Sequence, residues 1–484
     1  MAEPGLRRRQ SIVLSVCCLS VLLVSLDTTV LNVALPTMQR DLGSSVSGLQ
    51  WTLDAYTLVL ASLLTPAGST ADRVGRRRVF RLGLVLFTAG SALCGLAPTL
   101  GWLVAFRTVQ ALGGCMLTPV AMAILTNTFT RPRERARAIG VWGGVVGISM
   151  AAGPILGGTL VESAGWRSVF WLNVPIGLAT LLLATLYIPE SRAPRPRRAD
   201  PVGQLLVVTF LGTLTYAVIE APGHGWTAPP IVACLIVAAG ALAGLVPYEN
   251  HRTEPLIDPR LFRNASFSGA TATAVLAFAA LGGFLFANTL YLQRVLGLSA
   301  VDTGLRLLPM AVLSLVCPPV SGRIVGSRGP RLPLLIAGAG ITASGLLAVL
   351  VTRSAHPSPA LLSLTYALFG LGFGFVNAPI TDTAVAGLPR AQAGLAAAIA
   401  ATSRQAGTSL GIAVTGAAIA AGARPAAWWI IAVCGLAILA LTTVTTTRRT
   451  HDGGGGADRA HTSRRPPGDD RQAAPPRPGP RAGH

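Results

Sequence analysis

Long apolar segments alternate with short polar segments along almost the whole chain. A helix needs about 20 mostly apolar residues to cross a bilayer, and we find fourteen such runs; twelve or thirteen is the alternative count, because the fourth and thirteenth runs lack clean ends. The pattern predicts an all-α polytopic membrane protein. Its predicted spans cover residues 11–36, 49–67, 79–97, 101–125, 137–160, 167–188, 202–220, 231–248, 267–291, 303–322, 332–351, 360–380, 394–421 and 426–445.

The composition supports a membrane protein and excludes several other classes. Only 12% of the 484 residues are charged and the mean hydropathy is +0.58, whereas soluble domains carry about 25% charged residues. All 39 basic residues are arginines, so the chain lacks the lysine of a Walker A phosphate loop. The seven cysteines are scattered without a CxxC pair. We therefore expect no enzyme activity, no metal, no cofactor and no nucleic-acid partner.

The arginines predict the orientation in the membrane. Loops on alternate sides of the predicted spans, together with the two termini, hold 31 of the 39 arginines. Positive residues concentrate in cytoplasmic loops, so we expect both termini in the cytoplasm and residues 1–10 as a cytoplasmic N-terminus. Residues 448–484 are rich in Gly, Pro and Arg and predict a disordered cytoplasmic tail. The exceptions are Arg40, Arg167, Arg294, Arg353 and Arg424 in the opposite loops and Arg107, Arg306 and Arg404 within spans.

A short internal repeat predicts the domain organisation. The loop after the second span begins at Gly68 (GSTADRVGRRR), and a similar loop begins at Gly322 after the tenth span (GRIVGSRGPR), which aligns Gly75 with Gly329. The shift of eight spans equals a six-span half plus two inserted spans, as in transporters built from related halves. The predicted parts are a six-helix bundle (11–188), a cytoplasmic loop (189–201), two inserted helices (202–248), a cytoplasmic loop (249–266) and a second six-helix bundle (267–447).

Three ionisable residues in the predicted spans are candidates for chemistry. A charge in hydrocarbon costs roughly 2.5–3.5 kcal/mol and usually marks function. Asp27, Arg107 and Asp54 lie roughly 13, 9 and 8 Å from the outer ends of their spans, so two acids and one base could pair. A carboxylate that is paired in one conformation and desolvated in another would bind a proton differently in each, which is the requirement for proton coupling. The alternatives are a static pair that locks helices together and, for Asp54, a position at the wet mouth.

Two spans carry further candidates for a cavity or a hinge. Arg107, Gln110, Gly114 and Thr118 form one polar face of the fourth span, which is typical of a cavity lining or a helix contact. Asn32 of the first span is a further candidate. The fifth span carries small residues and a helix-kinking proline, which favour close packing or a hinge that seals against ion leak, at Gly153, Pro154, Gly157 and Gly158.

Five motifs together resemble a known family. In chain order they are LDTTVLNVALP from Leu26, GSTADRVGRRR from Gly68, RTVQALGG from Arg107, GPILGG from Gly153 and WRSVFWLNVPIG from Trp166. They look like the fourteen-helix drug–proton antiporters of the major facilitator superfamily, which include multidrug efflux and quaternary-ammonium resistance proteins. The resemblance covers the chain except its tail.

The resemblance implies roles for several residues. Asp27 and Arg107 would form the proton-coupling pair, and GPILGG is similar to a motif associated with antiport. The cytoplasmic gate would comprise Gly68, Asp72, Arg73, Gly75 and Arg76. The chain departs from the family pattern at Ala111, where glycine is usual, and it has no acidic residue in the thirteenth span, where some members carry one for dications.

We therefore expect a proton-coupled efflux antiporter in the cytoplasmic membrane. Its partners would be protons, the lipid bilayer and a small amphipathic drug or metabolite. The alternatives are an exporter of one endogenous metabolite, antibiotic or siderophore, and a membrane receptor or scaffold that transports nothing.

Overall fold

The computed structural model describes residues 4–193, 200–354, 356–386 and 393–454. Every regular element in these ranges is helical. The elements are α1 (Pro4–Leu42), α2 (Val46–Val74), α3 (Arg76–Leu96), α4 (Leu100–Thr128), α5 (Pro132–Ala164), α6 (Ser168–Trp171), α7 (Asn173–Tyr187), α8 (Pro201–His224), α9 (Pro229–Asn250), the 3₁₀ helix η1 (Pro259–Arg263), α10 (Ala265–Leu290), the π-helix η2 (Tyr291–Val295), α11 (Ala300–Arg306), α12 (Leu308–Arg328), α13 (Arg331–Val351), α14 (Pro359–Val385), α15 (Ala393–Ala420) and α16 (Arg424–Gly454).

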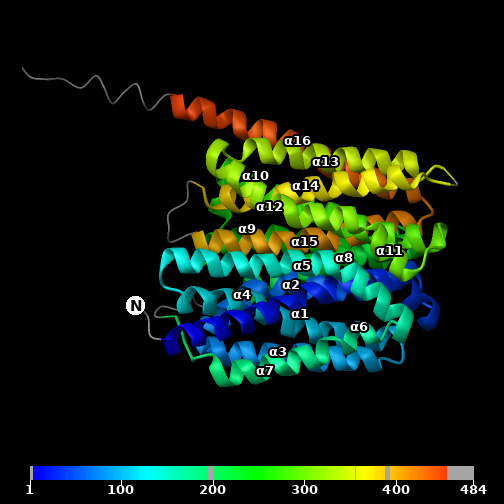
Figure 1. Cartoon of the computed structure of the whole chain (residues 1–484). Coiled ribbons are helices and arrows are strands. Elements are labelled where there is room, and N and C mark those ends of the chain that lie inside the picture. The colour runs from blue at the N-terminus through cyan, green and yellow to red at the C-terminus, as the bar shows by residue number, and fades with distance from the viewer. Residues whose placement is uncertain (1–3, 194–199, 355, 387–392, 455–484) are drawn as a thin grey trace, which may run out of the picture.

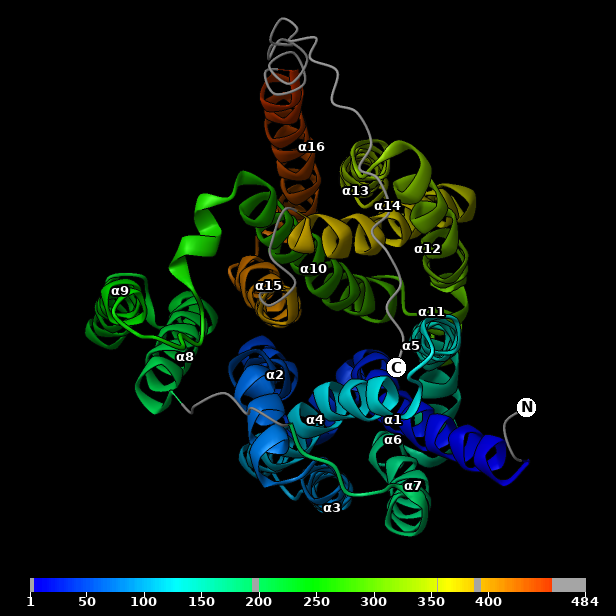
Figure 2. The same cartoon turned by 90° about the vertical axis from the view of Figure 1, so that its left-hand side faces the viewer.

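The long helices run side by side along one direction (Figure 1). Seen along that direction in Figure 2, α1–α7 form one group and α10–α16 form a second group above it. The helices α8 and α9 lie beside both groups. We call these the first group, the second group and the inserted pair. The α1–α2 end of the molecule holds the turn at residues 43–45, and the α2–α3 end holds the turn at Gly75.

Twelve helical segments in the described residues are long and apolar enough to cross a membrane. The remaining long helices are α2 and α15, which have 29 and 28 residues. They are less apolar because their polar residues face each other: the Gln50 amide of α2 donates to the Ala413 carbonyl of α15 at 2.8 Å. A helix covered by another helix does not need an apolar surface toward lipid.

Some predicted boundaries differ from the helices of the structure. The predicted sixth span is interrupted at Leu172, and the predicted tenth span is interrupted at Leu307. A proline follows each interruption within three residues, at Pro175 and Pro309. Proline disfavours the helical conformation of the residue before it. α1 begins at Pro4, within the predicted N-terminal segment. The backbone of α16 continues to Gly454, past the predicted boundary at residue 447. The rest of the predicted tail lies outside the described residues.

The repeat read from the sequence corresponds to a repeated helix ending. Gly75 ends α2 with φ +127°, and Gly329 ends α12 with φ +79°. Residues with a side chain rarely adopt positive φ, so glycine suits both turns. A glycine with positive φ therefore ends the corresponding helix in each group.

Buried apolar contacts between the two groups gather toward the α1–α2 end, while α2 also contacts α15 nearer the other end, where the hydroxyls of Thr65 and Thr402 are 3.2 Å apart. One buried apolar cluster there combines the first group, including Leu31 and Leu49, with Phe286, Leu290 and Ile412 of the second group. Other large clusters toward the α2–α3 end draw their buried members from one group alone. The buried residues of α5 reflect this, because all but Ala138 lie between Ser149 and Val161. The groups are thus closed against each other at the α1–α2 end.

Candidate functional site

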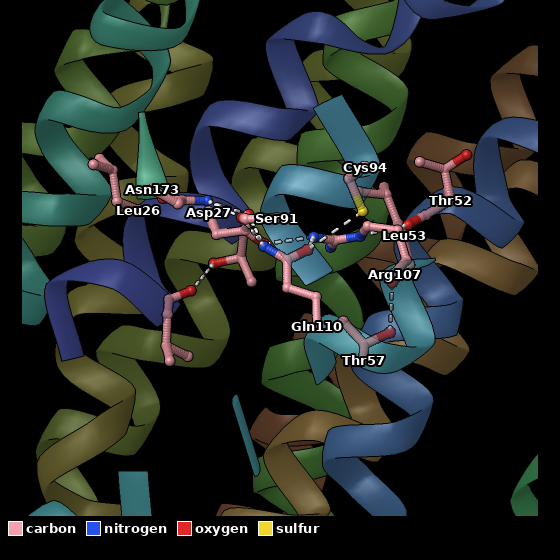
Figure 3. Close-up of polar contacts among 12 residues, drawn as sticks. Leu26, Asp27, Thr52, Leu53, Thr57, Ser91, Cys94, Arg107, Gln110 and Asn173 are labelled. Carbon is pink, nitrogen blue, oxygen red and sulfur yellow. Dashed lines mark hydrogen bonds and ion pairs between the residues drawn. The ribbon is translucent and has the colours of Figure 1, made fainter. Parts of the chain in front are cut away.

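Four helices of the first group bring polar side chains together around Asp27 (Figure 3). Asp27 comes from α1, Ser91 from α3, Arg107 and Gln110 from α4, and Asn173 from the start of α7. All five are almost completely buried, with exposed fractions of 0–1%. Buried polar groups require hydrogen-bond partners, and these side chains provide them for one another.

Both carboxylate oxygens of Asp27 are occupied by donors. Oδ2 lies 2.5 Å from Nη1 of Arg107, which makes a buried ion pair. Oδ1 accepts from Nε2 of Gln110 and from Nδ2 of Asn173, each at 2.8 Å. The Ser91 hydroxyl oxygen accepts from the same two amides, at 2.7 and 3.0 Å. The predicted pairing of Asp27 with Arg107 is therefore present in the structure.

The guanidinium of Arg107 has further contacts beyond its ion pair with Asp27. Its Nε donates to the Thr52 carbonyl of α2 at 3.2 Å, and its Nη1 also donates to Oε1 of Gln110 at 2.7 Å. The Cζ atom of Arg107 lies 4.3 Å from the centre of the Tyr56 ring, which is a cation–π distance. Nη2 has no hydrogen-bond partner among the described residues. Arg107 is therefore held by several helices of the first group and retains one unused donor.

This arrangement ties the charge of Asp27 to the position of Arg107. Three donors suit an ionised carboxylate, because a protonated carboxyl presents a hydrogen in place of one acceptor. Removing one partner of a buried ion pair leaves an uncompensated charge at a cost of about 3–5 kcal/mol. A proton can therefore be accommodated on Asp27 only if Arg107 finds another partner or water. The charge balance of the site thus depends on the distance between Asp27 and Arg107.

The structure does not bring Asp54 into this network, so the suggested three-way pairing is wrong for this conformation. Asp54 is fully buried and accepts a hydrogen bond from Thr57 at 3.0 Å, while Ser409 of α15 lies beside it. The reason is its direction: Tyr56, two residues further along α2, packs under Arg107, and two residues turn a helix by about 200°. Asp54 consequently faces the second group, and it does not lie at a wet mouth.

The opposite face of α1 packs on the small residues of α5. The Thr29 hydroxyl occupies the place that a Cβ of Gly153 would take, and the Val30 carbonyl would lie 2.8 Å from a Cβ of Gly157. The next contacts cross to the second group, where a Cβ on Gly158 would lie 2.6 Å from the Ala300 carbonyl. The GPILGG segment thus packs closely against both groups.

The remaining cavity candidates have different surroundings. Gly114 lies against Tyr56, whose hydroxyl oxygen would be 2.8 Å from an added Cβ. The Asn32 amide donates to the Thr28 carbonyl of its own helix at 2.7 Å. Asn32 also lines a cavity of about 20 Å³ between the two groups, together with Thr29, Met150, Pro154, Met310 and Ser314 among others. One water needs about 10–15 Å³, so this cavity is far too small for a drug.

The predicted gate residues pack against the segment that follows α7. Asp72 pairs with Arg76 at 2.8 Å, and its carbonyl accepts from the Ala193 amide at 3.0 Å. A Cβ on Gly75 would lie 2.6 Å from the Glu190 carboxylate. The remaining two make local contacts: Arg73 donates to the Ser69 carbonyl at 3.3 Å, and Gly68 lies against Pro119. In this conformation the loop is thus fastened within the first group.

Sequence reasoning missed several participants. Ser91 and Asn173 complete the Asp27 network, although only Asn173 lies within a quoted motif. Glu220 of α8 accepts a hydrogen bond from the Trp51 indole of α2 at 2.7 Å, which joins the inserted pair to the first group. An acid in an apolar span is itself a signal, and it was present at Glu220. No cluster of three or more metal-ligating side chains occurs in the described residues.

A bundle of long apolar helices around a buried ion pair defines an integral membrane protein, and comparison with known proteins gives its family. Residues 17–412 match the family model described as Major Facilitator Superfamily. The chain belongs to this family and is a membrane transporter.

Several relatives and solved structures are similar to the chain. It is 38% identical to "Multidrug resistance protein Stp" of Mycobacterium tuberculosis over 86% of this chain and 77% of that protein. It is 39% identical to "Tetracenomycin C resistance and export protein" of Streptomyces glaucescens over 85% and 76%, and 35% identical to "Methylenomycin A resistance protein" of Streptomyces coelicolor over 81% and 82%. A POT family transporter in complex with a thioalcohol-conjugated peptide superposes with a TM-score of 0.69 at 16% identity, over 90% of this chain and 96% of that one. This last likeness concerns the fold alone.

Proposed function

We propose that this protein is a proton-coupled antiporter that exports drugs or other amphipathic small molecules across the cytoplasmic membrane. The observation that carries the proposal is the buried Asp27–Arg107 pair, in which the charge of the acid depends on the position of the base. The names of the relatives, which refer to multidrug resistance and antibiotic export, support the direction of transport.

The membrane arrangement is part of the same proposal. In this proposal the chain crosses the membrane fourteen times, and α2 and α15 are among the membrane-spanning helices. Six spans form the first group, two form the inserted pair and six form the second group, and both termini are cytoplasmic. The arginine-rich loops near Arg76 and Arg133 favour the α2–α3 end as the cytoplasmic side. The contacts at the α1–α2 end would then close the transporter toward the outside, with GPILGG as the seal and the Asp72 loop as the cytoplasmic gate.

A flux assay tests the proposal. The purified protein is reconstituted in liposomes, and uptake or release of a compound panel is followed with and without an imposed proton gradient. We expect the Asp27→Asn variant to lose gradient-driven flux by at least about tenfold, because its side chain cannot exchange a proton, while compound binding is retained. Glu134→Gln is the matched control, since Glu134 makes an exposed surface pair. Unchanged gradient-driven flux in Asp27→Asn would remove this residue from the mechanism.

A dedicated exporter of one compound is the second candidate. It is favoured by two relatives whose names each refer to a single antibiotic. A panel in which one compound alone shows gradient-driven flux would support it, and efflux of several unrelated compounds would favour the multidrug proposal.

A further inference from the structure

A second arginine lies deep in a helix and has no acidic partner. Arg404 is the twelfth residue of α15, about 16 Å from the start of that helix. It is partly buried, and no ion pair joins it to an acid within the part of the chain that the structure describes. Charged residues in membrane helices are costly and almost always pair with a counter-charge or serve a function.

The contacts of Arg404 come from uncharged groups. Its Nη2 donates to the Thr381 hydroxyl of α14 at 2.9 Å, and its guanidinium lies 5.9 Å from the centre of the Phe278 ring of α10. Its Nε is buried without a hydrogen-bond partner in the described structure. A hydroxyl and an aromatic ring compensate a full charge less well than a carboxylate does. The charge of Arg404 is therefore left for another partner.

The surroundings of Arg404 suit an aromatic or apolar molecule with an acidic group. The half-buried Phe278 ring provides an aromatic surface beside the guanidinium, and the buried Phe373 ring supports it from behind at 5.2 Å in an edge-to-face contact. Thr381 is exposed, so the guanidinium can be approached from its side. Residues 386–423 contain no acidic side chain at all. The acid on α14 next to Thr381 is Asp382, which is exposed and not paired with Arg404.

We propose that Arg404 binds a carboxylate or another anionic oxygen group of the transported molecule, with the half-buried Phe278 ring packing against its apolar body. The preferred substrates are then acidic amphipathic compounds, in contrast to the cations of the quaternary-ammonium type. A guanidinium donates two parallel hydrogen bonds to a carboxylate. Nε of Arg404 is buried without a partner in the described structure, and an anion that reaches it would supply that partner. For its role in export this inference rests on the proposed function, but binding tests it independently.

The test measures binding of three matched fluorescent probes to the purified full-length protein in lipid nanodiscs, without a proton gradient. The probes are a methoxycoumarin carboxylate, its neutral methyl ester and its cationic trimethylammonioethyl ester, and fluorescence anisotropy gives each Kd. We expect the wild type to bind the carboxylate about tenfold more tightly than either ester. Arg404→Gln should abolish this preference, and Arg404→Lys should retain part of it, because lysine keeps the charge without the planar fork.

Two controls separate recognition from a structural role. Arg323→Gln removes an exposed arginine of α12 and should keep the preference for the carboxylate. Asp382→Asn should keep it as well. The inference is overturned if the wild type shows no preference, if Arg404→Gln keeps it, or if Asp382→Asn loses it. A carboxylate preference without gradient-driven flux in liposomes would contradict the antiport proposal and leave this inference standing.

Discussion

The two helix groups bury opposite chemistry at matching positions. Arg107 is the eighth residue of α4, and Tyr366 is the eighth residue of α14, which is the corresponding helix of the second group. Arg107 lies in a charged network with Asp27. Tyr366 lies in an aromatic cluster, with its ring 5.8 Å from Phe284, which stacks on Phe369 at 3.9 Å. The backbone arrangement is therefore repeated in the two groups, whereas the buried side chains at this position are charged in one group and aromatic in the other.

The contacts of Arg107 in the first group and Arg404 in the second group show the same contrast. Arg107 has a buried carboxylate at 2.5 Å. Arg404 has a hydroxyl and a ring. Arg107 is therefore neutralised within the first group, whereas Arg404 has no acidic partner among the described residues of either group.

The largest expected effect separates the two arginines by stability. Arg107→Gln leaves Asp27 buried without its counter-charge and should lower the free energy of unfolding by about 3–5 kcal/mol. Arg404→Gln leaves no charge unpaired and should lower it by less than about 1 kcal/mol. Thermal unfolding of both variants in the same detergent measures the difference. Equal losses of stability would mean that the two arginines have the same structural role.

The double variant Asp27→Asn/Arg107→Gln provides the control. Removing both charges should restore part of the stability that Arg107→Gln loses, because no isolated charge stays buried. A double variant as unstable as the single one would show that the loss comes from packing.

A smaller effect is expected where the groups touch. Gly158→Ala places a methyl group against the Ala300 backbone of the second group, so it should weaken closure at the α1–α2 end and reduce flux severalfold. Gly143→Ala is the matched control, because nothing lies within 4 Å of its added Cβ. Flux in liposomes measures both variants. Equal flux in the two would show that this contact does not affect the transport cycle.

The smallest effect concerns the inserted pair. Trp51→Phe removes the 2.7 Å hydrogen bond to Glu220 and should cost about 1–3 kcal/mol at this contact. Because the contact joins the inserted pair to the first group and does not join the two groups to each other, we expect a small decrease in Tm and retained flux. Trp102→Phe, which changes an exposed tryptophan, is the control. A loss of flux as large as that of Gly158→Ala would assign the inserted pair a direct part in transport.

The sequence predicted most helices and the central ion pair, because the length of an apolar run and the depth of a residue within it can both be counted along the chain. Apolar run length determines where a helix can cross a bilayer, and similar depth brought Asp27 and Arg107 together. The direction of a side chain around its helix axis is harder to predict. Asp54 has the right depth, but it lies about 200° away from Tyr56 and so faces α15.

Other participants were missed because their signals are ambiguous. A short polar residue in an apolar helix often bonds its own backbone, as Thr180 does with the Ile176 carbonyl. Ser91 looks the same in sequence, yet its hydroxyl oxygen accepts from Gln110 and Asn173. For Arg404 the sequence gives the charge and its place in a span. The lack of an acidic neighbour depends on α10 and α14, which only the folded chain brings near.

Helix α1 is shared between two different surfaces. Asp27 points toward α3, α4 and α7, and Thr29 points toward Gly153 of α5. These two residues are separated by about 3 Å along one helix. Any rotation or translation of α1 that accompanies a change at the carboxylate must also move Thr29 relative to Gly153. An exchanged hydrogen ion and an exported molecule could then influence each other through a single rigid rod without ever occupying the same place.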